Sequence, residues 1–148
     1  MTWGCFSKHG VGNLVIIDGK LTAVKYIEIL QNNLFDSTQK MGLEREYVFQ
    51  QDNDPKHKAK ITTKFLEDNN ITILDFPPQS PDLNPIEHLW DHLKRNVAIT
   101  ERTNKTIFIN ALYKEWNNIS LDIIKKLIQS IPNRLRAVIA AKGYHTKY

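Results

Sequence analysis

The chain has 148 residues, of which 41% are hydrophobic, so it can bury the core of one domain or most of one. Twenty Lys and Arg residues against 16 Asp and Glu residues give a net charge of +4, which favours a polyanionic partner only weakly. The sequence has no apolar run that approaches the roughly 20 residues of a membrane span, and its N-terminus lacks the layout of a signal peptide. Its single cysteine excludes an internal disulfide, so we expect an intracellular protein.

The first part of the sequence predicts a β-hairpin followed by a helix. Residues 2–7 and 14–17 read as two short strands, joined by a turn at Gly10, Val11 and Gly12. Thr22 is the expected N-cap of the helix. The apolar residues that share one face of this helix are Ala23, Tyr26, Ile27, Leu30 and Leu34.

The middle of the sequence predicts a strand, a helix and a second strand. Residues 47–51 form the first strand, Asp54 caps a helix that starts at Pro55, and residues 71–74 form the second strand. We expect Ile61, Phe65 and Leu66 to face inward. A unit of this length predicts a right-handed parallel crossover, which would bring Asp52 to the carboxyl edge of the sheet, where α/β sheets bind ligands.

A proline-rich loop at residues 76–85 precedes an amphipathic helix. Its buried stripe is predicted to contain Ile86, Leu89, Trp90, Leu93 and Val97. At 100° per residue, Glu87 lies at the margin of this stripe, so it can face a cleft while its neighbours pack.

Three further helices are predicted in the C-terminal third. They cover residues 105–116, residues 121–131 with Ser120 as the cap, and residues 133–142, which end at Gly143. Basic residues are expected on their outer faces, either as an ordinary solvated surface or as contacts to phosphates: Lys125, Lys126, Arg134, Arg136, Lys142 and Lys147.

Asp52 and Glu87 are the main candidates for a functional site. If the helix and strand between them return the chain to one sheet edge, the two carboxylates can converge, and paired carboxylates suit hard divalent cations. Each residue also has a purely structural interpretation. Asp52 can be a turn former, and Glu87 can complete a capping box with Asn84 as the N-cap and Pro85 as the first helical residue.

The histidines give weaker signals. His88 and His92 stand four residues apart on one helical face, as zinc ligands often do, but the order of the zinc-protease motif is broken and no cysteine is near. A solvated or DNA-facing surface is the favoured interpretation of this pair. His57 reads as an ordinary residue in the first turn of a helix, and we assign it no catalytic role.

Four segments together resemble a known family. WGCFS, QQDNDPKH, PPQSPDLNPIEHLW and GYHTKY are similar to the catalytic domain of mariner-superfamily (Tc/mariner-type) DDE transposases, in the branch whose last catalytic residue is glutamate. The resemblance implies an α/β, RNase H-like fold, in which a mixed sheet is flanked by helices and followed by a helical C-terminal extension. It also implies that Asp52 and Glu87 are the second and third catalytic residues and bind two Mg²⁺ or Mn²⁺ ions.

The same resemblance implies the partners and the location. Cut-and-paste transposition requires transposon ends and target DNA, and it takes place in the nucleus. Neither a membrane nor a small-molecule substrate is expected.

The resemblance also predicts that residues 1–148 form a single but partial catalytic domain. In the family, the first catalytic aspartate ends a strand that lies upstream of the segment like WGCFS, and helix-turn-helix modules precede the catalytic domain. We therefore expect this fragment to lack the first strand and to be inactive. The alternative is a non-catalytic remnant that binds DNA without sequence preference or associates with itself or with intact transposase. A general RNase H-like nuclease would leave PPQSPDLNPIEHLW and GYHTKY unexplained.

Overall fold

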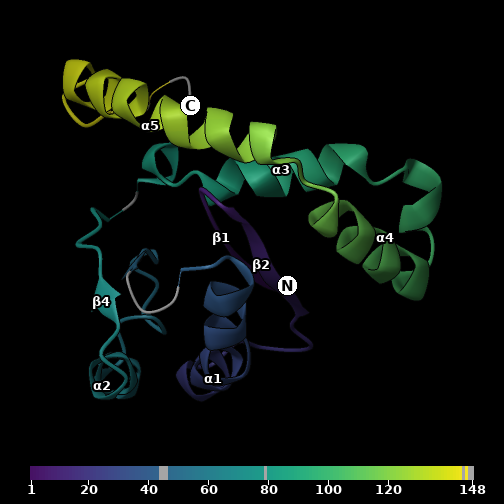
Figure 1. Ribbon diagram of the computed structural model, residues 1–148, viewed down its shortest axis with the longest axis horizontal. Helices are drawn as coiled ribbons and strands as arrows, with labels where there is room; N and C mark the ends of the chain where they lie inside the picture. Colours follow the sequence, from purple (N-terminus) through teal and green to yellow (C-terminus); the bar gives the residue numbers. More distant parts are fainter. Residues whose placement is uncertain (44–46, 79, 145, 147–148) are drawn as a thin grey trace. The chain divides into compact units, whose positions relative to one another are not determined.

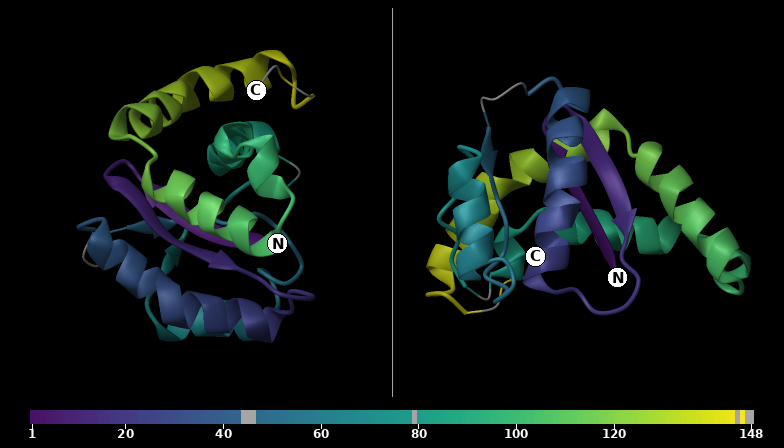
Figure 2. Two further views of the ribbon diagram at one scale, coloured as in Figure 1. Left: turned by 90° about the vertical axis from the view of Figure 1, so that its right-hand side faces the viewer. Right: turned by 90° about the horizontal axis from the view of Figure 1, so that it is seen from below.

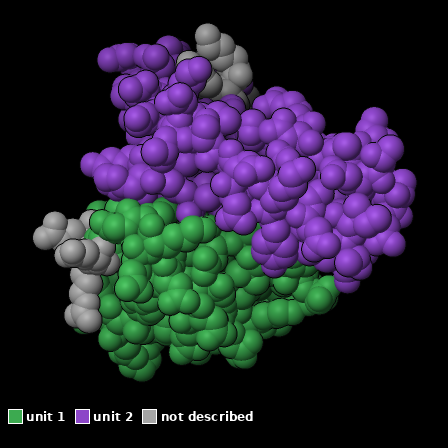
Figure 3. All heavy atoms as spheres, turned by 45° about the vertical axis from the view of Figure 1, so that its right-hand side comes forward, with its two compact units in different colours: residues 1–5, 12–79 green, residues 6–11, 80–148 purple. Residues whose placement is uncertain are grey.

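The computed structural model describes residues 1–43, 47–78, 80–144 and 146. The chain divides into two compact units, shown in two colours in Figure 3. Unit 1 contains residues 1–5 and 12–79, and unit 2 contains residues 6–11 and 80–148. Within the described residues, no helix combines the length and the apolar character that a membrane crossing needs.

The predicted N-terminal hairpin is present, but its turn lies elsewhere. Strand β1 (Thr2–Ser7) pairs with β2 (Gly10–Ile16), so the turn is at Lys8 and His9 and the second strand starts four residues earlier than predicted. Gly12 therefore lies inside a strand. A Cβ at this position would stand 2.6 Å from both Cys5 Sγ and Ser37 Cβ, so the glycine permits a close approach of the neighbouring helix rather than a turn.

That helix, α1 (Ala23–Lys40), runs alongside the hairpin in Figure 2. The predicted cap is confirmed, because Thr22 Oγ1 accepts a hydrogen bond from the Lys25 backbone N–H at 3.2 Å. The backbone N–H of Asn13 donates to Ser37 Oγ at 2.9 Å, which joins β2 to the helix. The core of unit 1 is built on this helix and includes Ile17, Leu21, Tyr26, Ile29, Leu30, Leu34, Leu66 and Ile71.

The parallel strand pair is confirmed, although its strands are shorter than predicted. Strand β3 (Val48–Phe49) pairs in parallel with β4 (Thr72–Ile73), in the register Val48 to Thr72 and Phe49 to Ile73. In the described residues this pair and the hairpin are separate two-stranded sheets. Both strands point their carboxyl ends towards the same edge, as the predicted crossover requires.

The connecting helix α2 (Lys60–Asp68) begins five residues later than predicted. The Asp54 carbonyl accepts hydrogen bonds from the N–H groups of His57 and Lys58, but the extended backbone of Ala59 (ψ 143°) stops this turn from continuing into the helix. The prediction that Ile61 faces inward is wrong, because its side chain is 49% exposed and Thr62 is buried instead. The Thr62 hydroxyl donates to the Lys56 carbonyl at 2.8 Å, which offsets the cost of burying it.

Unit 2 is mainly helical (Figure 1). Its elements are the 3-10 helices η1 (Pro81–Leu83) and η2 (Ile99–Arg102) and the helices α3 (Ile86–Asn96), α4 (Lys105–Asn117) and α5 (Leu121–Ala140). The predicted stripe of α3 is largely confirmed, since Leu89, Leu93 and Val97 are each at most 2% exposed. The half-buried Trp90 stacks on Trp116 of α4, with ring centroids 5.2 Å apart.

The prediction of two helices at residues 121–142 is wrong, because α5 is continuous and contains Pro132. Its start is as predicted, with Ser120 as the cap. Proline has no backbone N–H, so the helix lacks one hydrogen-bond donor at this position. Pro132 is exposed, so its ring lies in solvent. Two residues later a buried arginine anchors the helix, which favours continuation across the proline.

Candidate functional site

Asp52 lies in unit 1, shortly after β3. Its Oδ1 accepts hydrogen bonds from the Asp54 backbone N–H at 3.1 Å and from His57 Nδ1 at 2.6 Å. The side chain is 57% exposed. In the described part of the chain, Oδ2 has no hydrogen-bond partner. Asp52 is thus the turn former of the structural interpretation, and one of its carboxylate oxygens also remains open to a ligand.

The His57 side chain, which is nearly buried, forms a hydrogen bond with the Asp52 carboxylate. The side chain is 16% exposed, and its ring lies against that of Tyr26, with centroids 4.0 Å apart. Tyr26 donates from its hydroxyl to Gln51 Oε1 at 2.8 Å, and Gln51 Nε2 donates to the His57 carbonyl at 3.3 Å. Burial raises the pKa of Tyr26, and the nearby Asp52 carboxylate adds to this rise. His57 is therefore not an ordinary helix residue, and sequence reasoning missed its contact with Asp52.

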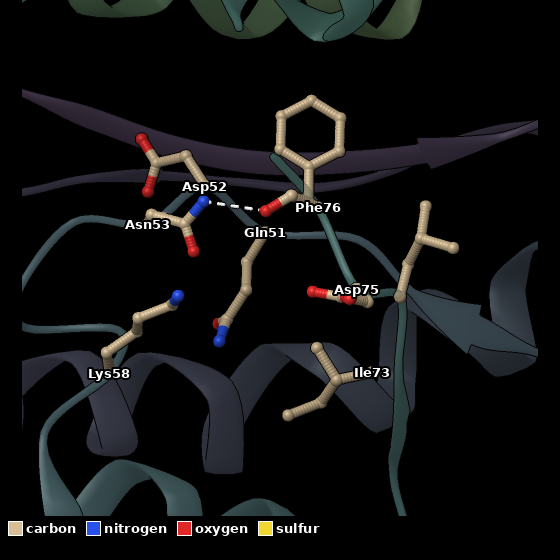
Figure 4. A pocket seen from close by; sticks show the side chains of 8 residues that line it. Gln51, Asp52, Asn53, Lys58, Ile73, Asp75 and Phe76 are labelled. Atoms are coloured by element: carbon tan, nitrogen blue, oxygen red, sulfur yellow. Dashed lines mark hydrogen bonds between the residues drawn. The ribbon is translucent and has the colours of Figure 1, made fainter. Parts of the chain in front are cut away.

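A pocket of about 260 Å³ opens beside Asp52 in unit 1 (Figure 4). Asn53 braces it, because Asn53 Nδ2 donates to the Phe76 carbonyl at 2.7 Å and ties the segment after β3 to the segment after β4. In Figure 4 the Lys58 side chain extends towards the pocket from one side and Asp75 from another. The lining residues are Gln51, Asp52, Asn53, Lys58, Ile73, Leu74, Asp75 and Phe76.

Two charged residues of the pocket were missed by sequence reasoning. Asp75 follows β4 as Asp52 follows β3, so the parallel pairing was the signal that could have found it. Lys58 is exposed, whereas the nearby Lys56 is engaged by Asp54 at 2.8 Å. Burial alone would raise the pKa of Asp54, but its bonds with the Lys56 amino group and backbone N–H hold the pKa below its ordinary value.

Glu87 lies in unit 2, in the first turn of α3, and is exposed. The predicted cap of α3 is wrong, because the N-cap position makes no side-chain hydrogen bond. Asn84 closes η1, where its N–H donates to the Pro81 carbonyl at 2.9 Å, so Pro85 becomes the N-cap of α3 and Glu87 the second helical residue. Because Asp52 and Glu87 belong to different units, their convergence on one metal site stays a prediction.

His88 and His92 are engaged within unit 2. His88 Nε2 lies 2.8 Å from Arg134 Nη1, and His92 Nε2 lies 2.8 Å from Asn96 Nδ2. Burial lowers the pKa of His88, and the positive charge of Arg134 lowers it further. In the residues that the structure describes, no cluster of three or more His, Cys, Asp or Glu side chains is placed to hold a metal ion.

The basic residues of the C-terminal third divide into two kinds. Four of them are exposed, as predicted: Lys125, Lys126, Arg136 and Lys142. Arg134 is only 2% exposed, so the prediction that it lies on an outer face is wrong. Hydrogen bonds from its guanidinium to Ser130, Asp82 and His88 offset the loss of hydrogen bonds to water. Lys147, like His145 and Tyr148 of the GYHTKY segment, lies outside the described residues.

Comparison with known proteins defines the family. A model of the DDE superfamily endonuclease family matches residues 2–107, a span that includes both Asp52 and Glu87. The Tcb1 transposase of Caenorhabditis briggsae is 40% identical over 148 residues, and the Tc1 transposase of Caenorhabditis elegans is 40% identical over 152 residues. Each match covers 100% of this chain and 54% of the relative, so the chain spans about half the length of these proteins.

Solved structures establish the fold. The catalytic domain of Mos1 transposase, solved with raltegravir and Mn, has a TM-score of 0.86 at 21% identity, over 99% of this chain and 76% of that one. The Mos1 strand transfer complex has a TM-score of 0.83 at 23% identity, over 99% of this chain and 43% of that one. The predicted RNase H-like fold is thus confirmed. The chain belongs to the DDE superfamily endonucleases and corresponds to part of a Tc1/mariner-type transposase catalytic domain.

Proposed function

We propose that the chain provides part of the catalytic centre of a cut-and-paste DNA transposase, with Asp52 and Glu87 as its second and third catalytic residues. The reaction has two transfers at phosphorus. Water first attacks a phosphodiester at the transposon end, and the broken P–O bond leaves a free 3′-hydroxyl. That hydroxyl then attacks a phosphodiester of target DNA, so that one P–O bond forms as another breaks. The observation that carries the proposal is the Asp52 carboxylate, which lies within the family match with Oδ1 held by His57 and Oδ2 open.

The residues fit a hard divalent cation. Exposed carboxylate oxygens from Asp52 and Glu87 are the donors that Mg²⁺ and Mn²⁺ prefer, and Mg²⁺ is commonly held by one or two carboxylates together with substrate phosphates. When bound, a pair of such ions activates the attacking oxygen and stabilises the leaving oxygen. In this scheme His57 fixes the orientation of the Asp52 carboxylate, and the Asp54 N–H supports it from the same side.

The proposal extends to the partners and the location of the protein. Its substrate is DNA, both the transposon end and the target, and its place of action is the nucleus. Assembly with itself or with intact transposase follows from the need to hold two transposon ends at once. Structures of Mos1 with a similar fold include a strand transfer complex, paired-end complexes and a pre-cleavage transpososome, which supports this part of the proposal.

A chimeric transposase tests the function. The segment of Tc1 transposase that matches this chain is replaced by the 148 residues, and excision of a Tc1 element is measured with Mg²⁺, with Mn²⁺ and with a chelator. We expect excision that depends on the metal. A folded chimera that binds transposon ends but never cuts them would instead support the non-catalytic remnant.

Lys58 gives a test of DNA binding by the chain itself. Its amino group is exposed beside the pocket, so we expect it to neutralise one phosphate of bound DNA. Changing Lys58 to Gln should weaken binding to any duplex and reduce the slope of log K against log salt concentration by about 1. Fluorescence anisotropy with a duplex of random sequence, at several NaCl concentrations, measures this slope.

Lys64→Gln is the matched control for this measurement. Lys64 lies on α2 of the same unit, and its amino group is paired with Asp68 at 3.0 Å. Its removal changes the net charge equally but should leave the slope nearly unchanged. Equal effects of the two substitutions would mean that the pocket does not mark the DNA-binding face.

A further inference from the structure

Arg134 is a buried cation that donates hydrogen bonds to three residues of unit 2. It lies in α5 and is 2% exposed. Its Nε donates to Ser130 Oγ at 2.7 Å, and its Nη1 donates to the Asp82 carbonyl at 2.9 Å and to His88 Nε2 at 2.8 Å. A buried guanidinium is tolerated only where such bonds replace water, so this set of contacts is specific rather than incidental.

The contacts of Arg134 flank Glu87 in the sequence. Asp82 lies in η1, just before α3, and His88 directly follows Glu87. Guanidinium N–H groups can only donate, so His88 Nε2 must accept and carries no proton in this arrangement. One nitrogen of Arg134 therefore fastens the chain on both sides of Glu87.

A second contact fastens the same loop. The backbone N–H and the hydroxyl of Thr146 both donate to Asp82 Oδ2, at 2.8 Å and 2.6 Å. Asp82 is thus held through its carbonyl by Arg134 of α5 and through its carboxylate by Thr146. These contacts join the SPDLNP and GYHTKY segments, which the sequence shows far apart.

We propose that Arg134 is a positioning residue for Glu87, an inference that rests on the proposed function. A metal-binding carboxylate has to be accessible to the ion and to DNA, so it cannot be fixed by burying the side chain. The backbone from which it projects has to be fixed instead, because catalytic geometry tolerates errors of only about 0.5 Å. Arg134 provides this restraint from α5, through Asp82 before the helix and His88 in its first turn.

Amide hydrogen exchange of the 148-residue chain tests the restraint. The amides of Glu87 and His88 donate to the carbonyls of Asn84 and Pro85 at 3.3 Å and 3.2 Å, so their exchange reports opening of the first turn of α3. In Arg134→Gln we expect exchange at these two amides to accelerate by about tenfold or more, while the amides of α4 change little. Thr146→Val, which removes only the hydroxyl contact, should produce a smaller acceleration at the same amides.

Arg136→Gln is the matched control. Arg136 is exposed on the same helix and, among the residues that the structure describes, donates only to Asn133 Oδ1 at 2.8 Å, so its loss should leave the exchange of the α3 amides unchanged. Two results would overturn the inference. One is the same exchange in the Arg134 and Arg136 variants. The other is equal acceleration in α3 and α4 in both Arg134→Gln and Thr146→Val, which would make the network a general support of unit 2.

Activity separates this inference from the proposed function. In the Tc1 chimera, Arg134→Lys keeps the charge but loses the planar fork, and we expect it to lower kcat while the KM for DNA stays nearly constant. A chimera that is inactive with Arg134 intact would count against the proposed function. An active chimera whose Arg134→Lys variant keeps its full kcat would count against the positioning role alone.

Discussion

Excision by the chimeric transposase should fall by about a thousandfold or more when Asp52 is changed to Asn. The amide keeps the size of the side chain and an oxygen that can accept from the Asp54 N–H, but it lacks the negative charge that holds a divalent ion. Glu87→Gln should have an effect of the same order for the same reason. The measurement is the rate of strand cleavage at a labelled transposon end in the presence of Mn²⁺.

Asp75→Asn is the control for this loss. Asp75 lines the same pocket and follows β4 as Asp52 follows β3, so the substitution removes an equal charge from the same surroundings. We expect most of the activity to remain. A collapse of cleavage in Asp75→Asn together with full activity in Asp52→Asn would move the catalytic role to Asp75. Circular dichroism spectra of each variant separate a loss of chemistry from a loss of fold.

Gly12→Ala should lower the free energy of unfolding by about 3 kcal/mol. The added methyl group would stand 2.6 Å from Cys5 Sγ and from Ser37 Cβ, and 2.7 Å from Ser37 Oγ. Ser37 is fully buried in α1, so neither the helix nor the strand can yield without disturbing the core of unit 1. Denaturant titration followed by fluorescence measures the change.

Gly19→Ala provides a comparison for this effect. Gly19 has a φ of +73° and nothing within 4 Å of an added Cβ, so alanine meets only the backbone penalty of about 1 kcal/mol. Gly12→Ala should therefore be clearly the more destabilising of the two. A smaller loss at position 12 than at position 19 would mean that the hairpin and α1 do not pack as closely as described.

Local signals in the sequence predicted much of the secondary structure. Thr22 and Ser120 have side chains that cap a helix by bonding the next turn, and both do so. The period of apolar residues located the buried stripe of α3, and the length of the unit between β3 and β4 predicted their parallel pairing. These features depend on neighbours close in the chain, which is why a single sequence contains them.

The predictions were wrong where contacts between residues far apart in the sequence determine the structure. Gly12 resembles a turn residue in the sequence, but its role comes from Ser37 of α1. Arg134 looks like a surface cation, yet it is buried because acceptors arrive from the region around η1 and α3. His57 was assigned to a helix that begins only at Lys60, so its contact with Asp52 was not foreseen. Sequence spacing alone does not show which distant groups become partners.

A crystal of the chain soaked in Mn²⁺ tests the central claim most directly, because the anomalous signal of the ion locates it independently of the protein. We predict an ion about 2.1 Å from a carboxylate oxygen of Asp52, with a carboxylate oxygen of Glu87 bound to the same ion or to a second ion about 4 Å away. The open oxygen of Asp52, Oδ2, should be the ligand. Mn²⁺ bound at Asp52 with Glu87 remote from every ion, or bound only at other carboxylates, would contradict the account.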